Sequence, residues 1–360
     1  MFSSSTARRS RNASNTFLSL AILASALSAQ QGPTTSSLTI GGLGAVGCGT
    51  TADPPTLPGD VPVSGGLDFA YDPTTQLLTL VVTNTSTVQA GVANPVVTRV
   101  ALNLPQLAVT AAALVSQSSA AGPAPNFTLG VDVDQAPPNS LSAGCLGKYG
   151  LFLEAANGTG IGNDEATVFA FGALSVPVGP VTFVIAITTT SPNLTAWSFS
   201  RSLPVNPPGQ PLPNAAFRFK GTGAASSSDW IGSAPTGSPA GWVIGNPISG
   251  QSITLVQNGA PGWYGCMVAS LLDGPTDVFG LSIPLGLPIF VLMAEVIPAN
   301  GISTVTIVVP DLPPVVGLEV LGAIATLEVK GAVIVVSPDN RTFQVSDQFT
   351  LNITDEDTGS

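Results

Sequence analysis

The sequence predicts an all-β protein with two antiparallel β-sandwich domains in tandem after a cleaved signal peptide. Runs of about four to eight residues rich in Val, Leu, Ile, Phe and Thr alternate with clusters of Gly, Pro, Asn, Asp and Ser, as in a sandwich. The 360-residue chain is longer than one small core needs. A Gly/Ser/Pro stretch at residues 221–239 separates two groups of candidate strands, which favours two domains.

The first domain is expected to span residues 30–235. Several of its runs alternate apolar and polar residues, which predicts one buried and one solvated face. The segment 108–119 is expected to be a short helix or a loop, because Ala111, Ala112 and Ala113 slightly favour helix. Strands are expected at residues 77–83, 96–102, 127–133, 149–153, 167–171, 182–188 and 215–220.

Residues 236–246 are expected to form a linker, followed by an immunoglobulin-like β-sandwich over residues 247–354 and a disordered tail at 355–360. Seven short strands separated by turn residues suit such a sandwich. They are expected at residues 252–257, 264–271, 289–296, 303–309, 318–329, 332–337 and 343–354.

The N-terminus, residues 1–29, has the pattern of an export signal. Arg8, Arg9 and Arg11 precede a short apolar stretch at residues 17–27, and small residues follow it up to Ala29. The stretch is too short to anchor the chain in a bilayer. We therefore expect a secreted protein, extracellular or at the cell surface, with no membrane insertion after cleavage.

The composition excludes several function classes. The chain has no histidine and only 9% charged residues, which rules out Ser-His-Asp and Cys-His catalysis and His-ligated zinc. Cleavage of residues 1–29 removes three of the ten basic residues and none of the 21 acidic ones, which leaves a net charge of −14. Such a chain repels nucleic acid and anionic membrane surfaces, so no nucleic-acid partner is expected.

The chain has three cysteines, Cys48, Cys145 and Cys266. Thiols outside the cytoplasm tend to pair, so we expect a Cys48–Cys145 disulfide within the first domain and a free, buried Cys266. The alternative is three buried free thiols. No two of them have the close spacing of a zinc site.

Three segments carry a family resemblance: Leu67–Asn84, Gly158–Phe169 and Ala216–Gly223. Together they resemble the ectodomain of exosortase-associated, PEP-CTERM type bacterial surface proteins over residues 36–235. The sorting signal of that family is a Pro-Glu-Pro motif, an apolar helix and a basic tail, and none of these occurs in this chain.

A second resemblance covers residues 247–353. Ile297–Pro310, followed by Val316-Gly-Leu, is similar to a small β-sandwich found at the C-terminus of secreted planctomycete proteins. Both resemblances imply extracellular β-domains, and neither implies a catalytic residue.

Two acidic clusters are candidate calcium sites. Asp132 and Asp134 would share one face of a strand, with the intervening Val133 facing inward. Asn163, Asp164 and Glu165 lie in a Gly-rich loop, where carboxylate and carbonyl oxygens could hold a hard cation. The alternatives are a solvated strand face for the first cluster and ordinary turn chemistry for the second.

The tryptophans could either bind sugars or pack inside the protein. Exposed tryptophans could stack on sugar rings, whereas buried ones would cover core edges or the contact between the domains. The residues concerned are Trp197, Trp230, Trp242 and Trp263.

Taken together, these features favour a secreted, non-enzymatic structural, matrix or adhesive protein of a bacterial cell surface. Its expected partners are extracellular polysaccharide or other surface proteins. The first alternative is a carbohydrate-binding module, assisted by calcium. The second is a glycoside hydrolase that uses carboxylates alone, which would need two facing acids. No catalytic residue is assigned, and calcium is the only cofactor considered.

Overall fold

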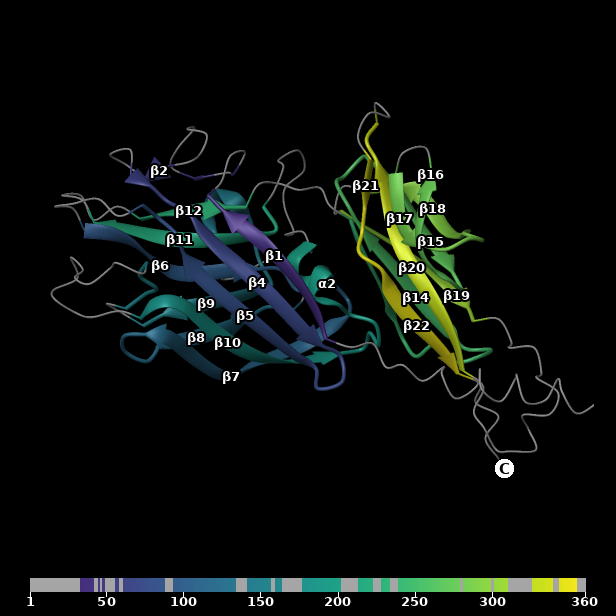
Figure 1. Cartoon of the computed structure of the whole chain (residues 1–360), viewed down its shortest axis with the longest axis horizontal. Coiled ribbons are helices and arrows are strands. Elements are labelled where there is room, and N and C mark those ends of the chain that lie inside the picture. The colour runs from purple at the N-terminus through teal and green to yellow at the C-terminus, as the bar shows by residue number, and fades with distance from the viewer. Residues whose placement is uncertain are drawn as a thin grey trace, which may run out of the picture.

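The computed structural model shows an all-β protein, as the sequence predicts. Two bodies rich in β-sheet lie side by side, one in purple to teal and the other in green to yellow (Figure 1). The structure describes residues 33–41, 45, 47–48, 56–57, 61–87, 93–133, 141–156, 159–163, 177–201, 213–222, 228–233, 239–278, 281–298, 301–309, 326–338 and 343–354.

The N-terminal body consists of two five-stranded antiparallel sheets. The first sheet has the order β1 (Thr34–Ile40), β4 (Gly65–Asp72), β5 (Leu77–Asn84), β10 (Val178–Thr189) and β7 (Val109–Ala121). The second has the order β12 (Ser228–Gly232), β11 (Ala215–Thr222), β6 (Ala93–Leu102), β9 (Leu151–Ala155) and β8 (Phe127–Val131). A small hairpin is formed by β2 (Thr56–Leu57) and β3 (Val61–Pro62).

Alternation along the strands builds the core between these two sheets. Successive residues of β5 are partly exposed and buried in turn, because their side chains point to opposite faces. The buried faces of the two sheets meet in one apolar cluster. Within it, the rings of Phe127 on β8 and Phe183 on β10 pack edge to face, with centroids 5.2 Å apart. The two sheets therefore form a β-sandwich.

The prediction for residues 108–119 was wrong, because this segment forms β7. It pairs with β10 through most of its length, with irregularities that shift the register. Alanine favours helix only weakly, and the open edge of β10 offers backbone hydrogen bonds along the whole segment. Tertiary pairing therefore overrides the local preference of Ala111 to Ala113.

A smaller apolar cluster covers the outer side of the second sheet. Phe152 and Trp230 pack there with ring centroids 5.4 Å apart, under a segment that contains η1 (Gly144–Leu146). The Cys48–Cys145 disulfide lies at this cluster, which confirms the predicted pairing. Cys266 is free, as predicted, although it is half-buried and not fully buried.

The C-terminal body has two principal sheets. The third sheet has the order β13 (Ala240–Ile244), β14 (Ser252–Asn258) and β19 (Ile302–Val308). The fourth has the order β18 (Phe290–Val296), β15 (Tyr264–Ser270), β20 (Thr326–Val336) and β21 (Phe343–Val345), with β22 (Phe349–Thr354) also pairing with β20. A hairpin of β16 (Asp273–Val278) and β17 (Leu281–Leu285) packs against the fourth sheet.

The expected boundaries of the last strands differ from the observed ones. Residues 326–336 form the single strand β20, where two strands were predicted. The predicted strand 343–354 is interrupted at Ser346, whose Oγ accepts a hydrogen bond from the Val333 amide at 2.7 Å and donates one to the Asp347 carbonyl. The Ser346 side chain takes the place of a backbone carbonyl of the neighbouring strand as the acceptor, and so divides the segment into β21 and β22. The predicted segments 1–29, 167–171, 318–325 and 355–360 lie outside the described residues.

The two bodies share apolar contacts. Residues 240–244, which lie within the expected linker, form β13 and pair with β14. Trp242 on β13 is fully buried in the same apolar cluster as the first two sheets, and its indole N–H donates to the Gln106 carbonyl at 3.2 Å. The Val243 amide donates to the Asn193 side-chain oxygen at 2.9 Å.

The short helix α2 (Ala196–Arg201) contacts both bodies at this junction (Figure 1). The Ala196 amide donates to the Thr34 hydroxyl on β1 at 2.7 Å, and the Trp197 indole N–H donates to the Pro239 carbonyl at 2.8 Å. The Arg201 carbonyl accepts a hydrogen bond from the Asn258 side-chain amide on β14 at 3.0 Å. The junction is thus packed and hydrogen-bonded.

Candidate functional site

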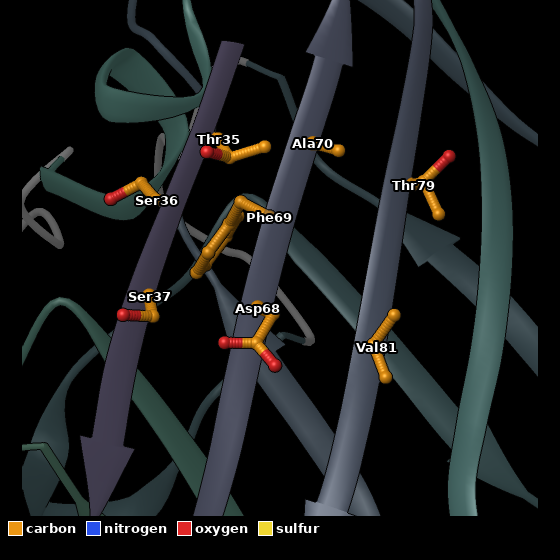
Figure 2. A pocket seen from close by; sticks show the side chains of 8 residues that line it. All are labelled: Thr35, Ser36, Ser37, Asp68, Phe69, Ala70, Thr79 and Val81. Carbon is orange, nitrogen blue, oxygen red and sulfur yellow. The ribbon is translucent and has the colours of Figure 1, made fainter.

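A hollow of about 470 Å³ lies on the outward face of the first sheet, over β1, β4 and β5 (Figure 2). The opposite face of these strands is buried in the core, so the hollow lies directly above a buried layer. It is lined by Thr35, Ser36, Ser37, Asp68, Phe69, Ala70, Thr79 and Val81.

Strand register arranges most of these residues in two rows across the sheet. The first row consists of Thr35, Ala70 and Thr79, and the second of Ser37, Asp68 and Val81. Paired residues on neighbouring strands share a face, so both rows point outward. Short side chains in both rows leave the space that forms the hollow.

Two other lining residues turn away from solvent. Phe69 is buried and belongs to the core, so it contributes to the floor. The Ser36 hydroxyl forms a 2.7 Å hydrogen bond with the Ser200 hydroxyl on α2. The outward polar groups are therefore the hydroxyls of the two rows and the Asp68 carboxylate.

The chemistry of the hollow follows from this set. Hydroxyls both donate and accept hydrogen bonds, and an ionised carboxylate accepts only. Among the described residues that line the hollow none is basic, so they offer nothing to neutralise a phosphate or a sulfate. The arrangement suits a neutral ligand rich in hydroxyl groups.

Asn163, a candidate calcium ligand, connects two segments through its side-chain amide nitrogen. It is buried, and its side-chain amide donates to the Ser86 carbonyl at 2.9 Å. The neighbouring side chain of Asn84 donates to the carbonyls of Pro95 and Ile161. These amides connect the end of β5, the start of β6 and residues 161–163.

Asp132 directly follows β8, where its backbone amide donates to the Gly150 carbonyl at 2.8 Å. The strand ends at Val131, short of the predicted residue 133. The other three candidates, Asp134, Asp164 and Glu165, lie outside the described residues. Among the residues that the structure describes, no group of three acidic or cysteine side chains could hold a metal ion.

The four tryptophans are engaged in packing. Trp242 and Trp230 are buried, and the half-buried Trp263 packs against the core of the C-terminal body. Trp197 is also half-buried, and the Arg201 guanidinium lies over its ring at 4.5 Å from the centroid. None of the four presents an open platform for stacking on a sugar, so the alternative that places them at core edges and the junction holds.

Asp72 and Asp273 have lowered pKa values. Hydrogen bonds from the Thr75 hydroxyl and the Thr74 amide lower the pKa of Asp72. The Gln348 amide and the Lys330 ammonium lower the pKa of Asp273. A catalytic acid needs a raised pKa, so neither carboxylate fits that role.

The hollow itself was not predicted. Its residues come from three strands that are separated by up to about 40 positions, and only the pairing register brings them together. The usable signal was local: short or polar side chains occupy every second position of residues 35–39, 66–70 and 79–83.

No protein-family model and no curated protein matches this chain. Within the described part of the chain, no helix combines the length and the hydropathy that a membrane crossing needs.

Proposed function

We propose that this chain is a secreted, non-enzymatic structural or adhesive protein that makes contacts through the faces of its β-sheets. The hollow over β1, β4 and β5 carries the proposal, because it is an open surface that presents hydroxyl groups and one carboxylate above the buried face of the sheet. The Cys48–Cys145 disulfide supports an oxidising compartment, as does the export signal expected at residues 1–29.

Export is tested by N-terminal sequencing of the protein recovered from the cells and from the medium. An extracellular or surface-bound chain that begins near residue 30 is the expected result. A cytosolic chain that still begins at Met1 would refute the proposal.

Carbohydrate recognition is the second candidate function, and the hollow is the observation that favours it. Sugars present hydroxyl groups in pairs, and the Asp68 carboxylate can accept hydrogen bonds from two of them. The neighbouring hydroxyls of Ser37 and Thr79 can donate and accept in turn. The short side chain of Ala70 leaves room for a ring above the strand.

A glycan array, with and without EDTA, tests this candidate. If the hollow binds a glycan, Asp68→Asn should weaken binding by about 10-fold to 100-fold, because it replaces a charged acceptor. Ala70→Trp should abolish binding by filling the space. Asp277→Asn, an exposed acid on β16, is the matched control and should leave binding unchanged.

The outcomes separate the candidates. Glycan binding that is unaffected by both hollow variants would exclude the hollow as the site. An array without any binding, with or without EDTA, would leave the structural or adhesive function alone. Binding that EDTA removes would support calcium assistance.

A further inference from the structure

The outer face of the fourth sheet carries a partly exposed apolar surface. Register pairs Val296 with Tyr264, Tyr264 with Val336, and Val336 with Phe343, so these four residues form one row across four strands. Directly paired residues share a face. Val296, Tyr264 and Phe343 are 50%, 54% and 52% exposed, respectively.

The next row on the same face is also apolar. It consists of Ala294, Cys266, Ile334 and Val345, which pair in that order across the same strands. Neither row contains a charged side chain. We call these two rows the apolar face.

The hairpin of β16 and β17 already covers the adjacent part of this sheet. Ile283 and Leu285 of the hairpin pack on Val268 and Ala332, the residues that continue the outer face of β15 and β20. Cys266 and Ile334 of the second row are half-buried against the same cluster. The sheet is therefore built to be covered on this side, and the hairpin ends before it reaches the row of Tyr264. The buried inner face of the same strands belongs to the core.

The size of the apolar face fits a protein contact at the small end of the range. An aromatic side chain buries roughly 150–250 Å² in full, so the two half-exposed aromatics and their aliphatic neighbours offer on the order of 400 Å². Two such faces together would bury about 800 Å², which is the size of a weak, transient protein contact.

The charge distribution indicates the occupant. The whole chain carries a net charge of −11, yet the apolar face carries none. Two copies can therefore bring these faces together without placing carboxylates opposite each other, although the rest of their surfaces repel. A charged partner would find nothing to pair with, whereas a second copy supplies a flat apolar sheet of the same size, related by a two-fold axis.

We propose that the apolar face is a self-association surface on which a second copy of this chain docks, sheet against sheet, to form a weak dimer. Tyr264 and Phe343 lie in the contact, and Cys266 becomes covered. This inference is independent of the hollow on the first sheet.

Cys266 makes the dimer measurable without mutation. The other two cysteines form the disulfide, so alkylation of the native protein labels Cys266 alone. The chain without residues 1–29 contains every described residue and serves for the experiment. Alkylation of Cys266 should slow several-fold as the protein concentration rises, in parallel with the appearance of dimer in analytical ultracentrifugation.

The variant Tyr264→Glu tests the surface directly. It would place two carboxylates in the contact, so the dimer dissociation constant should rise by about 100-fold or more. Val115→Glu is the matched control, because Val115 is 59% exposed on β7 of the other body, and it should leave the constant unchanged. Circular dichroism checks that both variants are folded, and Phe343→Glu replaces Tyr264→Glu if the latter fails.

The proposal is overturned if the native protein stays monomeric at every soluble concentration and the alkylation rate of Cys266 is constant. It is also overturned if a dimer forms but responds to Val115→Glu and not to the variants of the apolar face. A dimer that is lost only with Tyr264→Glu or Phe343→Glu supports it.

Discussion

Trp242→Ala should destabilise the whole chain, because this side chain fills the junction between the two bodies. Trp242 is 0% exposed and lies in one apolar cluster with Phe217 of the second sheet and Ile302 of the third. Truncation of a buried tryptophan to alanine costs about 3–5 kcal/mol, as the sum of lost transfer free energy and a residual cavity. That range includes the loss of the hydrogen bond from the indole N–H to the Gln106 carbonyl.

The assay is urea unfolding followed by far-ultraviolet circular dichroism and by alkylation of Cys266. The first probe reports on all sheets, and the second on the fourth sheet. In the native protein both should give one midpoint, since the bodies share a buried cluster. Trp242→Phe keeps most of the apolar volume and should lose only about 1–2 kcal/mol.

Leu107→Ala is the control, because Leu107 is exposed and should change the free energy of unfolding by less than about 0.5 kcal/mol. A change of less than that amount for Trp242→Ala would contradict a packed junction. Separate midpoints for the two probes of the native protein would contradict it as well.

Three further predictions concern other parts of the fold. Replacement of both Cys48 and Cys145 by alanine should lower the free energy of unfolding by about 4–5 kcal/mol on the chain-entropy model, measured by urea titration, and an unchanged value would contradict it. Gly241→Ala should lower the melting temperature and reduce the free energy of unfolding by about 1–3 kcal/mol, because the added Cβ would lie 2.6 Å from a methyl of Val333. An unchanged melting temperature would show that the neighbouring side chains can move to accommodate the added methyl group. Burial and the Asp72 charge raise the pKa of Tyr71 to about 12, above its value of about 10 in the unfolded chain. The free energy of unfolding should therefore fall as the pH rises from about 10 to about 12, and Tyr71→Phe should lack this part of the loss. Equal dependence of the free energy of unfolding on alkaline pH in both proteins would argue against it.

Short apolar runs bounded by turn residues made most strands predictable. The run 77–83 corresponds to β5, and the runs 252–257 and 264–271 correspond to β14 and β15 within one residue at their ends. In such segments the local preference for a strand agrees with the burial of apolar side chains in the core.

The features that the sequence did not predict have physical causes. β7 is rich in alanine and serine, and its conformation depends on the distant strand β10, which no local pattern reports. β13 follows a Gly/Ser/Pro stretch that resembles a linker, yet Trp242 and its neighbours are held by contacts with residues more than about 40 positions away. The hollow and the apolar face depend on register between strands, so they could not be read from spacing along the chain.

The packed junction has a practical consequence for dividing the protein. A fragment that begins after Ile244 would lack β13 and would leave an edge of β14 unpaired, with Val256 and Ile302 facing water. A fragment that ends before Pro239 would lack the carbonyl that accepts the hydrogen bond of the Trp197 indole on α2. Neither half would behave as an autonomous module, and the two are best produced and handled as one continuous polypeptide.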